Sequence, residues 1–126
     1  MGIEMRIEEV HHISPLWDAY CEFLKKKIRR GEVVVLNRKR IFKIWLNEFL
    51  PQWAKERNIP AYIYENYKNL VMYKDVDRQL NYVVNILIKE NYLERVGTGR
   101  YRNLWALQNG IFSMKNRGVS VKNANP

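Results

Sequence analysis

The most regular hydrophobic pattern in the chain lies between residues 75 and 91, where apolar side chains return every three or four positions. At about 100° per residue, this spacing places them in one stripe along a helix. Asp75 can cap the N-terminus of this helix, and Asp77 adds negative charge in the first turn, where the helix dipole favours it. The pattern predicts an amphipathic helix over 75–91. Its buried stripe comprises Val76, Leu80, Val83, Val84 and Leu87.

The polar positions of this segment fall on the face opposite the stripe. They are Arg78, Tyr82, Asn85 and Lys89, spaced i, i+4, i+7 and i+11. Each of these side chains can donate a hydrogen bond to a base edge or to a phosphate. Any surface helix also needs a polar outer face, so the row alone fits both a contact surface and plain solvation.

Two short β-prone segments follow this helix, at residues 93–96 and 100–107. Gly97-Thr98-Gly99 separates them, and its glycines allow the positive φ angles that a tight hairpin turn requires. One face of the second segment, expected to pack on the helices, is formed by Tyr101, Trp105 and Leu107. The arginines that gather around the turn are Arg95, Arg100 and Arg102. A hairpin that touches phosphates needs such a cluster, whereas a purely structural hairpin does not.

A helix is also predicted in the residues before Gly31. Ser14 can serve as its N-cap, Pro15 suits the first helical position, and Gly31 can close it. Its apolar face comprises Leu16, Trp17, Tyr20, Phe23, Leu24 and Ile28. Its last turns carry a basic run over residues 25–30, which can either contact phosphate or form a solvated face that keeps the helix soluble.

The next segment combines a short β-prone run with another helix. Residues 32–36 favour a strand. Asn37 can cap a helix that runs to Leu50, and Pro51 ends or kinks it because proline removes one hydrogen bond and clashes one turn back. The basic residues 38–40 at its start can remain solvated or contact phosphate, which a helix N-terminus also favours. The aromatic residues expected in the core or in a dimer interface are Trp17, Trp45, Phe49 and Trp53.

Residues 60–107 resemble a winged helix-turn-helix domain in the order of their predicted elements. The wing tip of this family is matched by residues 96–101, and its apolar spacing by Leu80, Val83, Leu87, Tyr92 and Leu93. The resemblance implies a short first helix over 62–70 with Pro60 ahead of it, a turn over 71–74, a recognition helix and a wing. It also implies a mainly α fold with a small β-hairpin (α+β), to which the N-terminal helices are additional.

The length of 126 residues fits one domain with a modest core. We expect a single winged-helix domain over residues 1–112. Within it we expect N-terminal helices in 14–58, the helix-turn-helix in 60–92 and the wing in 93–107. Residues 113–126 have little periodicity, several basic residues and no acid, and are expected to form a flexible basic tail.

The charge balance points to a class of partner. The chain carries a formal net charge of +9 at pH 7, which favours a polyanion: nucleic acid first, and an anionic membrane surface second. No apolar run approaches the ~20 residues needed to span a bilayer, and the first residues do not resemble a secretory signal. Cys21 is the only cysteine, so no internal disulfide can form, which suits a reducing cytoplasm.

Few residues suggest catalysis or metal binding. The single cysteine, Cys21, and two neighbouring histidines, His11 and His12, cannot build the usual four-ligand zinc site. The hairpin turn lacks the following helix that a nucleotide-binding loop needs. Asp75 and Asp77 can bind Mg²⁺ as nuclease carboxylates do, although helix capping explains them more simply. We therefore expect no catalytic residue, no metal and no cofactor.

These observations favour a non-enzymatic protein that binds double-stranded DNA sequence-specifically, expected to be a cytoplasmic transcriptional regulator that acts as a homodimer. The helix over 75–91 is expected to enter the major groove, with 93–107 as the wing. The predicted base contacts are Arg78, Asn81, Tyr82 and Asn85. The predicted contacts with the DNA backbone or minor groove are Lys74, Lys89, Arg95, Arg100, Arg102, Arg38, Lys39 and Arg40. The alternatives are a protein–protein or RNA-binding adaptor in a replication or transcription assembly, and a small metal-dependent nuclease.

Overall fold

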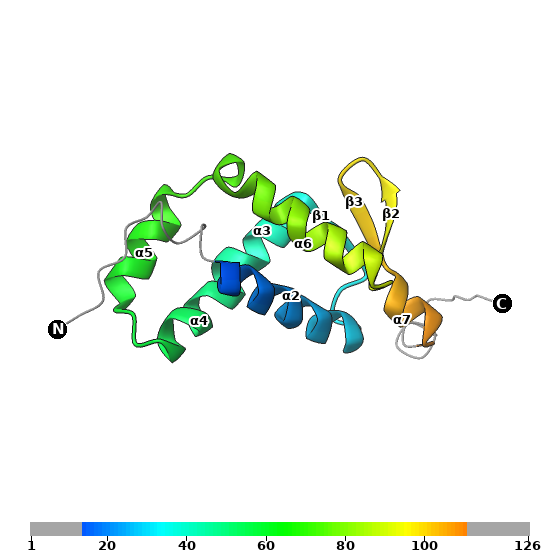
Figure 1. Ribbon diagram of the computed structural model, residues 1–126, viewed down its shortest axis with the longest axis horizontal. Helices are drawn as coiled ribbons and strands as arrows, with labels where there is room; N and C mark the ends of the chain where they lie inside the picture. The colour runs from blue at the N-terminus through cyan, green and yellow to red at the C-terminus, as the bar shows by residue number, and fades with distance from the viewer. Residues whose placement is uncertain (1–13, 111–126) are drawn as a thin grey trace.

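The computed structural model describes residues 14–110, which are mainly helical and include a small antiparallel sheet (Figure 1). The helices are α2 (Ser14–Arg29), α3 (Arg38–Ile44), α4 (Leu50–Glu56), α5 (Ala61–Leu70), α6 (Asp77–Lys89) and α7 (Leu104–Gln108). The π-helical turn η1 (Trp45–Phe49) joins α3 to α4, and the 3-10 turn η2 (Tyr73–Val76) leads into α6. The strands are β1 (Val35–Asn37), β2 (Leu93–Gly97) and β3 (Arg100–Asn103). The predicted α+β class, mainly helical with a hairpin, is confirmed, while the predicted tail over 113–126 lies outside the described residues.

The sheet has the strand order β1–β3–β2, so the early strand β1 extends the hairpin of β2 and β3. β1 pairs with β3 so that Leu36 lies opposite Tyr101, and both side chains are buried. The β-prone run predicted over 32–36 forms a strand only at 35–37. Val33 lies before the strand, and its carbonyl accepts from the side-chain amide of Asn103, the last residue of β3, and not from a backbone N–H.

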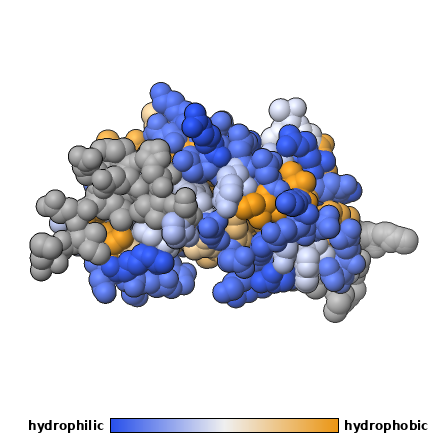
Figure 2. Space-filling model, viewed as in Figure 1, coloured by the Kyte–Doolittle hydropathy of each residue, from blue (hydrophilic) through white to orange (hydrophobic). Residues whose placement is uncertain are grey.

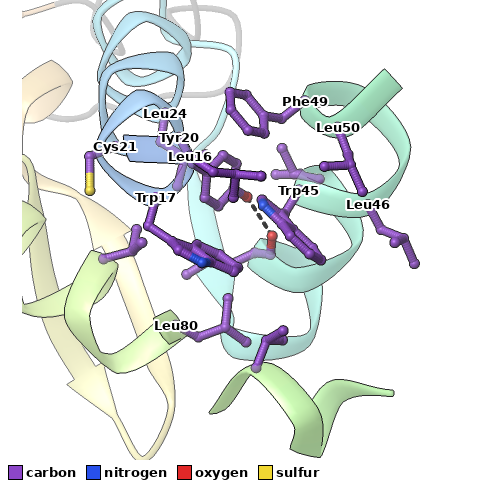
Figure 3. Close-up of a cluster of buried hydrophobic side chains, with 14 of the residues drawn as sticks. Leu16, Trp17, Tyr20, Cys21, Leu24, Trp45, Leu46, Phe49, Leu50 and Leu80 are labelled. Carbon is purple, nitrogen blue, oxygen red and sulfur yellow. Dashed lines mark hydrogen bonds between the residues drawn. The ribbon is translucent and has the colours of Figure 1, made fainter. Parts of the chain in front are cut away.

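The core lies between α2, the α3–η1–α4 segment and α6. The apolar stripe predicted on α6 is buried throughout, and this face packs mainly on α2 and also on α3. Trp17 of α2 stacks on Trp45 of η1 with ring centroids 4.6 Å apart (Figure 3). The hydroxyl of Tyr20 donates to the carbonyl of Ile41, which joins α2 to α3. Trp17, Trp45, Phe49 and Trp53, the aromatic residues expected in the core or in a dimer interface, are all buried in the core.

Pro51 follows the π-helical turn, and the turn explains how the chain accommodates this proline. Proline has no N–H and crowds the preceding helical turn. The helix widens in η1, where the N–H of Leu50 donates to the carbonyl of Trp45. The carbonyl of Leu46 is thereby released, and it accepts from the hydroxyl of Tyr64 at 2.7 Å. The π-helical turn before Pro51 therefore also provides the carbonyl that anchors α5 to the preceding helix.

Two predicted elements differ from the structure. The segment predicted as helix from residue 75 begins as η2, and the carboxylate of Asp75 accepts from the N–H of Met72 at 2.8 Å instead of capping α6. The second strand of the hairpin ends at Asn103, because the Asn103 side chain accepts from the N–H of Ala106 and so starts α7. Leu107 is therefore 48% exposed, contrary to its predicted packing on the helices.

The helix predicted over 62–70 is present as α5, but it does not form the expected pair with α6. α5 packs on α4 at the end of the molecule away from the sheet (Figure 1). α3 is the earlier helix that packs against both the start of the sheet and α6. The α4–α5 segment is therefore inserted between α3 and α6.

Candidate nucleic-acid interface

The outer face of α6 presents three donors to the solvent. The side chains of Arg78, Asn85 and Lys89 are exposed, and they form no hydrogen bond or ion pair with other residues in 14–110. Asp77, the only acidic residue of this helix, is bound to Arg38 at 2.8 Å. Because this carboxylate is paired with Arg38, no acidic side chain of α6 offsets the positive charges of Arg78 and Lys89 on the outer face.

The other two predicted base contacts on α6 are engaged within the molecule. Tyr82 is 48% exposed, and its hydroxyl donates to Asp18 of α2 at 2.7 Å. This hydrogen bond raises the pKa of Tyr82. The side-chain oxygen of Asn81 accepts from Arg38. Asn81 keeps its NH₂ group for an outside acceptor, whereas Tyr82 must exchange its internal partner to donate to a base.

Arg38 lies where α3, α6 and the hairpin turn meet. Its Nε donates to the hydroxyl of Tyr73 at 2.6 Å. Its Nη2 donates to the carbonyl and the carboxylate of Asp77 at 3.0 and 2.8 Å, and its Nη1 donates to Asn81. The backbone N–H of Arg38 donates to the carbonyl of Gly99 at 3.2 Å. The sequence suggests a phosphate contact for Arg38, but in this structure its guanidinium is directed at protein acceptors.

The three arginines of the hairpin differ in their surroundings, although all of them are exposed. Arg102 pairs with Glu94 across the two strands at 2.6 Å. The guanidinium of Arg95 lies 5.6 Å from the ring centroid of Tyr101. The side chain of Arg100 has no partner within the described range. Arg95 and Arg100 are therefore available to an outside phosphate, whereas Arg102 already shares its charge with a carboxylate.

The remaining predicted contacts lie on elements that adjoin α6. Lys39 and Arg40 are exposed in the first turn of α3, which the side chain of Asn37 caps by accepting from the N–H of Arg40 at 2.7 Å. The side chain of Arg40 also reaches the carbonyl of Val35 at 3.5 Å. Lys74 is exposed in η2, directly before α6. Since α3 and η2 both pack on α6, these cations flank that helix.

Within the basic run over 25–30, by contrast, Lys25 and Lys27 are bound to carboxylates of other elements. Lys25 contacts Glu90 at 2.6 Å, and Lys27 contacts Glu48 at 2.8 Å. The two lysine side chains are only 11% and 16% exposed. The hydrogen bond to Glu90 raises the pKa of Lys25. This run therefore joins α2 to its neighbours, which favours the structural interpretation over phosphate contact.

The surface shown in Figure 2 is mostly hydrophilic and is broken only by small hydrophobic patches. Single exposed apolar side chains are ordinary on a protein surface, whereas one large continuous patch marks a contact site. This side of the molecule therefore offers polar and charged groups, and not a broad apolar face, to a partner.

Metal and redox chemistry find little support in residues 14–110. Within this range no cluster of three or more His, Cys, Asp or Glu side chains could hold a metal ion. Asp75 and Asp77 are bound to protein donors. Cys21 is buried, and burial raises its pKa to about 12, so that it is a neutral thiol at pH 7. None of the helices in this range is long and apolar enough to cross a membrane. His11 and His12 lie outside the described residues.

Two residues that organise the structure, Arg38 and Asn103, have no local signal in the sequence that reveals this role. Arg38 and Asp77 are 39 residues apart. The side chain of Asn103 donates to the carbonyls of Ile28 and Val33, which are 75 and 70 residues away. A polar residue at a strand end, directly before an apolar segment, is the only hint that Asn103 caps a helix.

Comparisons with protein families, with curated proteins and with solved structures gave no match to this chain. The function is therefore inferred from the arrangement of α6, α3 and the hairpin.

Proposed function

We propose that the protein binds double-stranded DNA as a winged helix-turn-helix protein. α6 enters the major groove, and the β2–β3 hairpin lies along the phosphate backbone as the wing. The observation that carries this proposal is that the hairpin turn is held beside the N-terminal half of α6. Arg38 bonds to Gly99 in the turn and to Asp77 and Asn81 on α6, so the two basic elements form one surface.

The order of the elements supports this arrangement. α2, β1, α3 and α6 precede the hairpin, and β1 adds a third strand to its sheet. In this interpretation the helix pair consists of α3 and α6, because these helices pack on each other. The α4–α5 segment then lengthens the connection between the two helices.

The exposed side chains of the surface suit two kinds of contact. Arg78 and Asn85 offer donors for base edges, since arginine matches guanine and asparagine matches adenine in the major groove. Lys74, Lys89 and Arg100 suit phosphates, which attract cations whatever the sequence. We further propose that the protein regulates transcription as a homodimer, since two such surfaces would read two half-sites.

Fluorescence anisotropy with a random duplex at graded salt tests the proposal. About six phosphate contacts should lower the affinity roughly 10³-fold between 50 and 200 mM salt. Lys89→Ala on α6 should weaken binding and reduce the salt slope by about one. The control is Lys55→Ala, which removes an exposed lysine of α4 and should change neither quantity. A flat salt response, or no binding at low salt, contradicts DNA binding.

A protein–protein adaptor is the second candidate, and one observation favours it. Tyr62, Leu70 and Met72, on and directly after α5, are 73%, 57% and 56% exposed. Large apolar side chains are enriched where proteins contact one another. Tyr62→Ser and Met72→Ser should leave duplex affinity unchanged if α6 and the hairpin bind DNA. An RNA hairpin in the anisotropy assay, and a plasmid-cleavage assay with Mg²⁺, separate the RNA-binding and nuclease alternatives.

A further inference from the structure

We propose that Arg38 positions the hairpin turn against α6 and does not itself contact the nucleic acid. The consequence for DNA binding rests on the function proposed above, whereas the positioning itself can be tested on the free protein. The inference replaces the expectation from the sequence that Arg38 binds the DNA backbone.

Arg38 holds the hairpin turn through its backbone, and the stem of its side chain lies beside the turn. Its N–H donates to the carbonyl of Gly99 at 3.2 Å. Gly99 has a φ of +63°, a conformation that residues with a Cβ rarely adopt. A Cβ at this position would lie 3.6 Å from the Cδ of Arg38. The stem of Arg38 therefore lies beside the turn, and the backbone hydrogen bond to Gly99 joins the two.

The guanidinium of Arg38 holds the other side of the same junction. It donates four hydrogen bonds, to the hydroxyl of Tyr73, the side chain of Asn81, and the carbonyl and carboxylate of Asp77. Tyr73 in turn packs edge-on against Phe42 of α3, with ring centroids 5.9 Å apart. One side chain thus ties α3, η2 and the first turns of α6 to the hairpin turn.

Arg38 has little left to offer a phosphate. A guanidinium has five N–H donors, Arg38 already donates four hydrogen bonds to protein acceptors, and its side chain is only 17% exposed. Burial lowers the pKa of Arg38, but the hydrogen bonds to Tyr73 and Asp77 act in the opposite direction and the pKa is raised, so the group stays charged in place. Turning outward would also leave the Asp77 carboxylate unpaired beside the incoming phosphates, which adds repulsion.

Asp77→Ala separates positioning from direct contact, because only the positioning role predicts a loss of site preference. If Arg38 binds phosphate, the substitution frees its guanidinium and removes a negative charge, so every duplex should bind more tightly. If Arg38 positions the hairpin, the substitution removes the ion pair that helps to link the turn to α6. The preference for a selected site over a random duplex should then fall roughly tenfold. Arg38→Lys should cause the same loss, since one ammonium cannot serve all these acceptors.

Hydrogen exchange of the free protein tests the positioning without DNA. Arg38→Lys and Asp77→Ala should each speed amide exchange over residues 97–101 roughly tenfold, because charged hydrogen bonds that hold the turn are lost. The double variant should add little to either single variant, because both substitutions break one network. The control is Lys39→Ala in the same turn of α3, where the lysine is exposed. It should leave the exchange unchanged.

The outcomes decide the proposal in both directions. Faster exchange over 97–101 in both variants, with loss of site preference, supports it. Unchanged exchange there, or tighter binding of every duplex by Asp77→Ala with the site preference retained, overturns it. If the wild-type protein binds no duplex, the DNA-binding function fails, and the exchange measurement alone decides whether Arg38 holds the hairpin.

Discussion

Two regions of the molecule carry clusters of basic residues, and their surroundings are opposite. On α2, Lys25 and Lys27 are bound by carboxylates that come from other parts of the chain. On α6 and the hairpin, Arg78, Lys89 and Arg100 are exposed and have no carboxylate partner in residues 14–110. A run of positive charge in a sequence therefore indicates a polyanion-binding surface only when the acidic side chains lie elsewhere in space.

The difference in pairing also separates stability from binding. A partly buried lysine that bonds to carboxylates contributes to folding, because its removal leaves those carboxylates without a partner. An exposed arginine without a partner contributes little to folding and keeps its full charge for another molecule. Substitutions in the two clusters should therefore affect different measurements, and the following predictions test this division in order of expected effect.

The largest effect is expected within α6, where the buried and the outer face lie on one helix. Leu87→Ala removes a fully buried side chain and should lower the free energy of unfolding by about 2–5 kcal/mol. Asn85→Ala on the outer face should leave the melting temperature nearly unchanged. Urea unfolding of both variants measures the difference. A larger loss of stability from Asn85→Ala would mean that the two faces have been assigned the wrong way round.

The faces of α6 are predictable from the sequence, because helical periodicity depends only on residues within one or two turns. The Asn37 cap and the glycine-containing hairpin turn are local in the same sense. The end of β3 is not local. Residues 104–107 have strand-like composition, but the side chain of Asn103 caps a helix there and bonds to carbonyls 75 and 70 residues away. Distant partners therefore outweigh local propensity at this point.

The candidate site is predictable to the same extent and for the same reason. The exposure of Arg78 and Asn85 follows from the helical period. The internal role of Arg38 does not, because it depends on Asp77, which lies 39 residues later in the chain. Likewise, nothing near Tyr82 in the sequence indicates that its hydroxyl is bound to Asp18.

The next largest effect concerns sequence preference. Arg78 lies near the start of α6, where docking geometry brings side chains closest to base edges. Its guanidinium can donate two parallel hydrogen bonds to one guanine. Arg78→Ala should therefore cost about 1–3 kcal/mol of affinity on the preferred site and relax discrimination at one base position. Selection from a random duplex library with both proteins measures this. An unchanged preference would exclude Arg78 as a base reader.

A smaller effect, on stability alone, is expected in the basic run over residues 25–30, here called the α2 cluster. Lys27→Ala should lower the free energy of unfolding by about 1–2 kcal/mol and leave duplex affinity nearly unchanged. The hydrogen bond to Lys27 lowers the pKa of Glu32, so this pair stabilises the fold above the usual glutamate pKa of about 4.3. The contribution is lost as the pH falls through the lowered pKa. The melting temperatures of wild type and variant should therefore converge as the pH falls through this lowered pKa.

The exposed neighbour Lys26 provides the control for this measurement. Its side chain has no ion pair within the described part of α2 and its surroundings. Lys26→Ala should change neither the melting temperature at neutral pH nor its dependence on pH. If Lys27→Ala weakens duplex binding more than it lowers stability, the α2 cluster is part of the contact surface after all.

The smallest effect is expected at the hairpin, where a paired and an unpaired arginine lie on the same strand. Arg100 has no partner in the described residues, so Arg100→Ala should weaken all duplexes about equally and reduce the salt slope by about one. Arg102 is bound to Glu94 at 2.6 Å, so its charge is already compensated, and Arg102→Ala should reduce the slope by less. Affinities for selected and random duplex at several salt concentrations measure both. Equal changes in slope would show that pairing with a carboxylate does not decide which cations meet phosphate, and the contrast between the α2 cluster and the hairpin would lose its basis.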